Sequence, residues 1–321
     1  MAPTLADLCA SPDHYLHSFD GGDAVFVAMD RAAYRRSIFL DHRISPAAEG
    51  ATRVPVQALV ERLPEARPLG WIFHVAHCGS TLLARALDEL GGGLVLREPL
   101  ALRQVALDPD PARLRLVLAM LGKRYPGDLP TLVKANVPVN FLLPEIAAAD
   151  PQAPAILLHL SLRDYCLAIL RSDQHRGWLR HVTTLLAPQL ASFDPAIDGA
   201  RAAALWLAQS ERFAAALAAM PNARSLDSER FYAEPADALR AAAALLDRPD
   251  DPDRVAAVTA GPLFARHAKR PDRAFDNLAR LAQRARDADA LALELADAEA
   301  WIAQHDRAAR RALGALANRQ L

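Results

Sequence analysis

Cysteine, long apolar runs and net charge are all scarce in this 321-residue chain. The three cysteines, Cys9, Cys78 and Cys166, lie far apart, which argues against a disulfide framework and a cysteine-based metal site. No apolar run reaches the roughly 18 residues of a membrane span, and the first residues lack the basic start and apolar run of a signal peptide. We therefore expect a cytoplasmic protein with no membrane partner.

Charge is nearly balanced, with 37 basic against 38 acidic residues and a net charge of −1. No whole-chain field attracts nucleic acid, so a basic site would have to be local. The pairs His14-x-x-His17 and His74-x-x-His77 have no third ligand at helical spacing, and no metal site is predicted. Hydrophobic residues make up 52% of the chain, which is enough for a sizeable core.

Short apolar, β-rich segments alternate with helical patterns over the first half of the chain. The predicted strands are Ala24–Met29, Ser37–Asp41, Trp71–Ala76, Leu94–Arg97, Thr131–Ala135, Ala155–Leu160 and Ala223–Leu226. The predicted helices among them are Leu82–Leu90, Pro111–Lys123, Pro138–Ala149 and Asp164–Ser172. This alternation predicts a three-layer α/β fold with a mainly parallel central sheet of about five strands, covered by helices on both faces.

The second half of the chain is rich in helical patterns. Helices are predicted at Pro195–Ala219 and Pro235–Asp247, and residues 274–318 predict one or two long terminal helices. No repeat and no clear boundary interrupts the chain, so a single domain over residues 1–321 is expected. Its most recognisable part spans about residues 70–247, preceded by an extension and followed by a helical region over 248–321.

A phosphate-binding loop is predicted at residues 74–83, where a buried strand meets a helix. Free N–H groups of the first helical turn and the helix dipole favour an anion at such a junction. Gly79 allows close backbone approach, and the hydroxyls of Ser80 and Thr81 can donate to phosphate oxygens. The same pattern also fits a helix capped by Ser or Thr after an ordinary turn, so both interpretations stay open.

Nucleotide hydrolases and kinases use a related loop in which Gly, four residues and Gly-Lys-Ser/Thr follow one another. Here the lysine position holds Ser80 and the first glycine position holds His74. Strand Ala155–Leu160 continues into Ser161 rather than into the acidic residue that would serve magnesium. A kinase or ATPase is therefore the minor alternative.

His77-Cys78-Gly79-Ser80-Thr81, followed by Leu82-Leu83, resembles the phosphate loop of sulfotransferases that use 3′-phosphoadenosine 5′-phosphosulfate (PAPS). That loop has a basic residue, a small residue, Gly, Ser/Thr and Thr, with Lys or Arg where this chain has His77. The resemblance implies that the donor binds His77, Cys78, Gly79, Ser80, Thr81 and Leu82. A neutral imidazole at position 77 would weaken donor binding or turnover. The helix start also predicts a lowered pKa for the Cys78 thiol.

Two further segments of this family follow in the same order. Leu96-Arg97-Glu98-Pro99 resembles the acidic-Pro turn of bacterial and tyrosyl-protein types, which implies that Glu98 is the general base. Leu132-Val133-Lys134 resembles the strand whose lysine contacts the transferred sulfuryl group, and the position of the cytosolic members' catalytic histidine holds Asn136. A helix cap at Glu98 and a surface lysine at Lys134 are the structural alternatives.

The resemblance also implies a 3′-phosphate site. Arg163 follows a predicted strand as the family's arginine does, but the position eight residues later holds Arg171, with Ser172 one further. The basic stretch containing Arg266 and Lys269 is comparable to a C-terminal loop that closes over the 3′-phosphate. A local pair of Arg163 with Asp164 and a solvated basic loop are the alternatives.

Together these motifs imply a PAPS-dependent sulfotransferase that needs no metal and acts on a small-molecule or peptide acceptor. The alternative is a degenerate relative that binds a nucleotide or a partner without transfer, which His77 and the shifted Ser172 favour. Should Glu98 not be the base, His74 and His159 lie near the same sheet edge. Neither the acceptor nor the oligomeric state follows from these residues.

Overall fold

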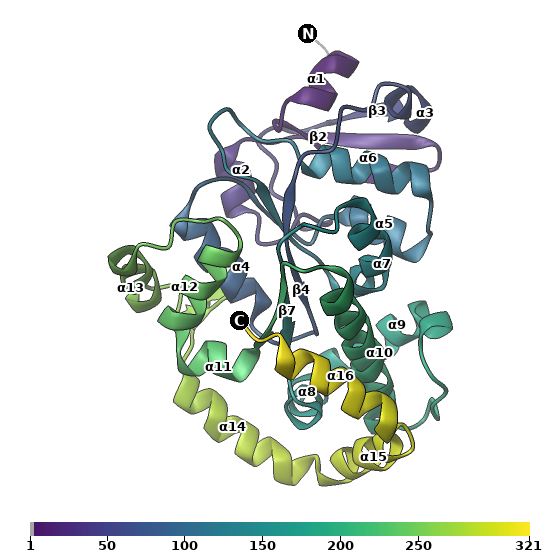
Figure 1. Ribbon diagram of the computed structural model, residues 1–321, viewed down its shortest axis with the longest axis vertical. Helices are drawn as coiled ribbons and strands as arrows, with labels where there is room; N and C mark the ends of the chain where they lie inside the picture. The colour runs from purple at the N-terminus through teal and green to yellow at the C-terminus, as the bar shows by residue number, and fades with distance from the viewer. Residues whose placement is uncertain (1–2) are drawn as a thin grey trace.

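A five-stranded parallel sheet forms the centre of the protein in the computed structural model, which describes residues 3–321 (Figure 1). Its strands are β4 (Leu69–His74), β5 (Val95–Arg97), β6 (Thr131–Lys134), β7 (Ala155–His159) and β8 (Ala223–Asp227). They lie in the order β5-β6-β4-β7-β8, and every neighbouring pair is parallel. The residues of β4, β5, β6 and β7 are all buried, as expected for a sheet covered on both faces. The prediction of a mainly parallel central sheet is confirmed.

Helices cover both faces of this sheet and make the three predicted layers. Figure 1 shows α4, α12 and α13 on one face and α5, α7, α10 and α16 on the other. The helices that follow strands or connect them are α4 (Ser80–Leu90), α5 (Leu100–Leu107), α6 (Pro111–Leu121), α7 (Leu143–Ala149), α8 (Leu162–Ile169), α9 (Asp173–Leu185), α10 (Asp198–Ala219), α11 (Ser228–Ala233), α12 (Pro235–Leu245) and α13 (Pro252–Ala260). Short 3-10 helices lie at Val137–Leu142 and Ala187–Gln189. Among the described residues, no helix has the length and apolarity needed to cross a membrane.

The chain changes direction around the central strand β4. From β4 it crosses to β5 at one edge of the sheet, and after β6 it crosses to β7 on the other side of β4. In open α/β sheets, ligands bind outside the carboxyl ends of the strands at such a switch point. The topology therefore directs attention to the loop between β4 and α4 and to the residues that end β5, β6 and β7.

A second sheet, antiparallel and three-stranded, precedes the central one. It consists of β1 (His14–Asp20), β2 (Asp23–Ala28) and β3 (Ala51–Pro55) in sequence order. The predicted strand at 24–29 is confirmed by β2, whereas β1 and β3 were not predicted. Short helices α1 (Leu5–Ala10), α2 (Arg31–Arg36) and α3 (Val56–Val60) complete this part.

The predicted strand Ser37–Asp41 is wrong, because this segment is irregular. The buried guanidinium of Arg97 donates to the backbone carbonyls of Tyr34, Arg35, Ser37 and Ile38, and it also pairs with Asp88 at 2.8 Å. Four carbonyls converging on one side chain leave this segment no regular ladder. Arg97 thereby fastens the segment that carries Phe39 to the strand that ends at Glu98.

The C-terminal region contains three helices, where one or two long ones were predicted. They are α14 (Asn277–Ala290), α15 (Ala292–Ala303) and α16 (Asp306–Asn318). A short hairpin of β9 (Arg266–His267) and β10 (Arg270–Ala274) precedes them. In Figure 1, α14 runs beyond α8 and α11, which begin at the carboxyl ends of β7 and β8. The chain end returns to β8, where the Leu321 N–H donates to the Ser225 carbonyl at 2.8 Å.

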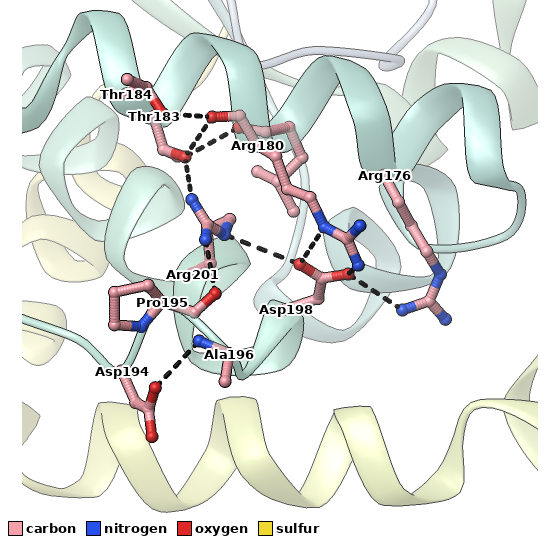
Figure 2. A network of polar contacts seen from close by, with 10 residues as sticks. Arg176, Arg180, Thr183, Thr184, Asp194, Pro195, Ala196, Asp198 and Arg201 are labelled. Atoms are coloured by element: carbon pink, nitrogen blue, oxygen red, sulfur yellow. Dashed lines mark hydrogen bonds and ion pairs between the residues drawn. The ribbon is translucent and has the colours of Figure 1, made fainter.

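An ionic cluster around Asp198 fastens α9 to α10 (Figure 2). The buried Asp198 carboxylate accepts from Arg180 at 2.7 and 3.0 Å and from Arg176 at 3.4 Å, and Arg201 lies 3.6 Å away. Arg176 also pairs with Glu294 of α15 at 2.6 Å. Burial alone would raise the pKa of Asp198, but the hydrogen bonds and charges of these arginines lower it. The cluster therefore fixes α9 relative to two neighbouring helices.

Replacing Asp198 with Asn should lower the free energy of unfolding by about 2 kcal/mol, because the charge-assisted hydrogen bonds to Arg176 and Arg180 and the ion pair with Arg201 are lost. Urea denaturation followed by circular dichroism measures the change. Asp237→Asn serves as the control, because that carboxylate is 71% exposed and lies 3.9 Å from Arg240. Its effect should stay below about 0.5 kcal/mol. Equal losses for the two variants would show that the cluster adds nothing to stability.

Candidate active site

The loop between β4 and α4 brings an unusual backbone to the sheet edge. Gly79 is the N-cap of α4 and has φ 84°, and a Cβ atom there would lie 2.8 Å from the Tyr232 hydroxyl. His77 has φ 58°, a left-handed conformation that non-glycine residues seldom adopt. Strained residues of this kind cluster at ligand-binding sites. Glu98, at the end of β5, is strained in the same way with φ 57°.

Ser80 and Thr81 are the first two residues of α4, so neither is a side-chain cap. The N-cap is Gly79, which has no side chain to satisfy the N–H groups of the first turn. Thr81 is 2% exposed, and its Oγ1 atom has no hydrogen-bond partner among residues 3–321. The interpretation as a conventionally capped helix does not match this geometry, and the start of α4 keeps its capacity to bind an anion.

Cys78 forms hydrogen bonds that hold the loop in place. Its thiol is buried and donates to the Val75 carbonyl at 2.7 Å, while its own carbonyl accepts from the Ser228 hydroxyl at 2.6 Å. Burial raises the pKa of Cys78 to about 11, so the thiol stays protonated. The predicted lowering of this pKa is wrong, because desolvation outweighs the helix terminus here.

Three strand ends join in a buried polar cluster beside this loop. The ammonium of Lys134, at the end of β6, lies 2.5 Å from Glu98 Oε1 and 3.0 Å from His74 Nε2. Lys134 is fully buried, and the Glu98 N–H also donates to the Lys134 carbonyl at 2.7 Å. The structure thus joins the two predicted catalytic residues in one ion pair. The alternatives of a surface Lys134 and a helix-capping Glu98 do not match these contacts.

The charge states within this cluster follow from burial and proximity. Burial alone would raise the pKa of Glu98, but Lys134, His74 and Lys269 together lower it to about 2. Burial and the charge of Lys134 lower the pKa of His74 to about 3. The ring is therefore neutral, with Nδ1 at 2.9 Å from the Val75 carbonyl and Nε2 at 2.9 Å from the Ala135 carbonyl and 3.0 Å from the Lys134 ammonium. Glu98 is therefore ionised, and its Oε1 atom is bound to Lys134.

Two more buried polar atoms near the same sheet edge have unused hydrogen-bonding capacity. They are Oδ1 of Asn136, a residue that follows β6, and Nε2 of His159, the last residue of β7. Neither has a partner among residues 3–321, as is also the case for Thr81 Oγ1. Buried polar groups are normally paired, so three unpaired buried atoms at one edge of the sheet favour the binding of a polar ligand there.

The predicted basic loop divides between two places. Lys269 lies in the hairpin turn, 5.9 Å from the centre of the Phe39 ring, and Lys134 lies at the same distance from that ring. The Lys269 side chain is exposed to solvent, yet the surrounding protein lowers the pKa of Lys269. Lys269 therefore belongs with Glu98 and Lys134. Arg266 is exposed and donates to the Pro271 carbonyl at 3.2 Å within the hairpin.

Arg163 and Ser172 flank α8. Arg163 is exposed in the first turn of α8, and its sequence neighbour Asp164 pairs with Arg284 of α14 at 3.0 Å. The structural alternative, a local ion pair of Arg163 with Asp164, is not formed, because Asp164 pairs with Arg284 instead. Ser172 is the N-cap of α9, with its hydroxyl 3.4 Å from the His175 N–H. Among residues 3–321, no hydrogen bond or ion pair joins Arg163 or Ser172 to the Lys134 cluster.

Residues that the motifs did not predict surround His77. The His175 ring centre lies 4.2 Å from that of His77, and the Trp178 ring packs edge-on at 5.8 Å. Arg171 Nε donates to His175 Nδ1 at 3.2 Å. Burial, together with Lys269, His175 and Arg171, keeps the pKa of His77 well below its usual value. The four-residue spacing of Arg171 and His175 was the available sequence signal, since it places them on one helical face.

Helix α14 crosses the same edge of the sheet through ion pairs (Figure 1). Arg280 and Arg284 both bind Glu229, which begins α11, at 2.7 Å. Arg280 also lies over the Tyr232 ring at 4.2 Å, and the Tyr232 hydroxyl faces Gly79. Helix α14 is therefore connected to the phosphate loop through Tyr232.

A separate cavity lies away from this edge of the sheet. It has a volume of about 620 Å³ and is lined by 10–13, Arg67 and 124–128, at the amino ends of β4 and β6. None of the residues at the carboxyl edge lines it. Over residues 3–321 no group of three or more His, Cys, Asp or Glu side chains has the arrangement of a metal site.

The chain matches no protein-family model and no curated protein. Among solved structures it is similar to a sulfotransferase from Alicyclobacillus acidocaldarius, at 18% identity over 58% of this chain and 83% of that chain, with a TM-score of 0.40. It is also similar to the sulfotransferase domain from the curacin biosynthetic pathway, at 12% identity over 59% of this chain and 77% of that chain, with a TM-score of 0.39. Both are sulfotransferases, the family that the sequence motifs resemble.

The low pKa of Glu98 predicts an acid-dependent loss of stability. A carboxyl whose pKa is about 2 when folded and about 4.5 when unfolded stabilises the protein above pH 4.5 and loses this contribution as the pH falls towards 2. In Glu98→Gln the buried Lys134 has lost its carboxylate at every pH. We expect the stability difference between wild type and Glu98→Gln to shrink by about 2 kcal/mol from pH 5 to pH 2.5.

Urea denaturation at a series of pH values measures this difference. Glu211→Gln, an exposed position on α10, is the control and should keep the acid slope of the wild type. A constant difference between wild type and Glu98→Gln across the series would show that the ion pair with Lys134 does not hold Glu98 ionised.

Proposed function

We propose that this chain is a sulfotransferase that moves a sulfuryl group from PAPS to a hydroxyl or amine of a small-molecule or peptide acceptor. One observation carries the proposal. A buried lysine, a partly buried carboxylate and an anion-binding helix start meet at the carboxyl edge of one parallel sheet, through Lys134, Glu98 and Thr81. This combination fits transfer of an anionic group to a neutral nucleophile.

The loop supplies the groups that suit the donor. The uncapped first turn of α4 and the unpartnered Thr81 hydroxyl can donate to the oxygens of the 5′-phosphosulfate. The loop holds Ser80 where a hydrolase loop has its lysine, so the positive charge comes from the neighbouring strand through Lys134. For the 3′-phosphate we propose Arg163 with Ser172, because both lie at the ends of α8 and keep exposed polar groups.

Glu98 and Lys134 divide the chemical work in this proposal. The acceptor oxygen or nitrogen attacks sulfur in line, the bond from sulfur to the bridging oxygen breaks, and Glu98 takes the acceptor's proton. Lys134 stabilises the negative charge that gathers on the bridging oxygen, which leaves as part of adenosine 3′,5′-bisphosphate.

The ion pair also links base strength to donor binding. While Lys134 is bound to Glu98, the carboxylate has a pKa of about 2 and is a weak base. A donor anion draws the ammonium of Lys134 towards itself, and the pKa of Glu98 then rises towards its ordinary value. Glu98 therefore gains basicity when the donor is in place.

Glu98→Gln keeps the shape of the side chain and removes the proton acceptor. We expect turnover to fall by about 10²–10⁴, the usual contribution of general base catalysis, with donor affinity equal to or above that of the wild type, because Glu98 no longer competes with the donor for Lys134. Because the acceptor is unidentified, the assay follows slow hydrolysis of PAPS to adenosine 3′,5′-bisphosphate, for which water is the acceptor. Calorimetric titration of the same variant measures donor affinity.

Each other outcome has a distinct meaning. Intact turnover in Glu98→Gln would transfer the base role to another residue, with His159 as the first candidate because its Nε2 atom is unpartnered in residues 3–321. Tight PAPS binding by a wild type that never hydrolyses it would support the degenerate, non-catalytic relative. Binding of ATP with magnesium in preference to PAPS would overturn the proposal in favour of a kinase.

A further inference from the structure

A second set of basic side chains faces the phosphate loop from the α8–α9 junction. Arg171 ends the segment after α8, and His175 lies in the first turn of α9. The Arg171 Nε–H donates to His175 Nδ1 at 3.2 Å, so the remaining ring proton of a neutral His175 is on Nε2. The His175 ring packs against the His77 ring, with centres 4.2 Å apart and planes tilted by 49°. A guanidinium and two imidazoles therefore form one continuous row that ends at the loop.

The surroundings of this row carry an excess of positive charge. Lys269 and Arg171 both act on the pKa of His77 and on that of His175, and Arg270 also acts on His175. The opposing charge near Arg171 comes from Asp287, beyond which Arg284 adds another cation. Within residues 3–321, the side-chain hydrogen bond of Arg171 goes to His175 and not to a carboxylate. Cations gathered in this way repel one another unless an anion lies between them.

The fold holds this row in a fixed place. Arg176 and Arg180, one and five residues after His175 in α9, bind the buried carboxylate of Asp198, as Figure 2 shows. Trp178 of the same helix packs edge-on against His77. Helix α9 therefore cannot move away from the loop without breaking the Asp198 cluster. A row fixed in this way is preorganised for a ligand.

We propose that Arg171 and His175 bind the anionic phosphosulfate group at the loop, where they supply the positive charge that His77 lacks. This inference rests on the proposed function and extends it to two residues of α8–α9. Two departures from the sulfotransferase pattern then compensate for each other: the loop has a neutral imidazole at 77, and the position eight residues after Arg163 holds a cation. The hydrogen bond from Arg171 to His175 Nδ1 polarises the ring and makes its Nε2–H a stronger donor to an anion.

Binding of adenosine 3′,5′-bisphosphate, measured by calorimetry at pH 7.5, tests the compensation. Arg171→Gln should raise the dissociation constant about 10- to 100-fold, as expected for a lost charge-assisted hydrogen bond. His77→Lys should bind as tightly as the wild type or tighter. The double variant His77→Lys/Arg171→Gln should return to within about threefold of the wild type, because a charge on the loop replaces the one removed. Arg310→Gln, an exposed position on α16, is the control and should change binding by less than about twofold.

A measurement that does not depend on the nucleotide keeps this inference separate from the proposed function. Sodium sulfate is titrated into protein labelled at histidine, and the imidazole resonances of His77 and His175 are followed by NMR. In the wild type, sulfate should shift both resonances and raise both apparent pKa values, because an anion stabilises the protonated rings. In Arg171→Gln the same sulfate concentrations should produce much smaller shifts.

Rescue by His77→Lys and sulfate-induced shifts that depend on Arg171 both support the inference. If sulfate shifts the two histidines while adenosine 3′,5′-bisphosphate does not bind, the anion site stands and the proposed function fails. If the nucleotide binds equally well to wild type and Arg171→Gln, the inference fails while the proposed function stands. A loss of binding in Arg171→Gln without rescue by His77→Lys overturns the compensation and assigns Arg171 a structural role.

Discussion

The buried ion pair of Lys134 with Glu98 is the interaction on which the rest of this site depends. A fully buried ammonium without a partner would cost several kcal/mol, so the ends of β5 and β6 must deliver the carboxylate to within hydrogen-bonding distance. The pairing of Arg97 with Lys134 in the ladder between these strands sets that distance, and Glu98 adopts a left-handed backbone to complete it. His74 from β4 takes the remaining side of Lys134. Residues at the ends of three neighbouring strands therefore meet at the single charge of the Lys134 ammonium.

The same constraint explains why the sheet edge is suited to an anionic ligand. Lys134 is neutralised by a single carboxylate, while Lys269, Arg171 and the start of α4 add positive potential around it. An anion can therefore compete with Glu98 for Lys134 without leaving either group in an uncompensated environment. In this account the exchange of partners by Lys134 is the event that converts a stabilising ion pair into a base and a charge stabiliser. Structural stability and chemistry use the same two side chains.

The central strands and the loop could be predicted from the sequence because each has a strong local signal. An apolar run of strand length, followed by Gly79 and an amphipathic helix, specifies β4, the turn and α4 with little help from distant residues. Lys134 and Glu98 were singled out by their places at strand ends, and the parallel register brings such ends together. The catalytic and binding roles of these residues stay predictions.

The features that were missed depend on tertiary contacts. Residues 37–41 have the composition of a strand, but Arg97 claims the carbonyls around them from 60 residues away. The helix start likewise predicted a lowered pKa for the Cys78 thiol, whereas burial raises that pKa to about 11. The packing of His175 of α9 against His77 of the loop before α4 joins segments that follow different strands, and no short motif encodes it. Side chains that act across elements are the part of this site that a single sequence conceals.

A crystal structure of the complex with adenosine 3′,5′-bisphosphate tests the central claim most directly. The account predicts that the 5′-phosphate lies at the start of α4, within hydrogen-bonding distance of Thr81 Oγ1, with the Lys134 ammonium turned from Glu98 towards it. A nucleotide bound in the cavity beside Arg67 and Arg124, with the Lys134–Glu98 pair closed and Thr81 Oγ1 still without a partner, would contradict it.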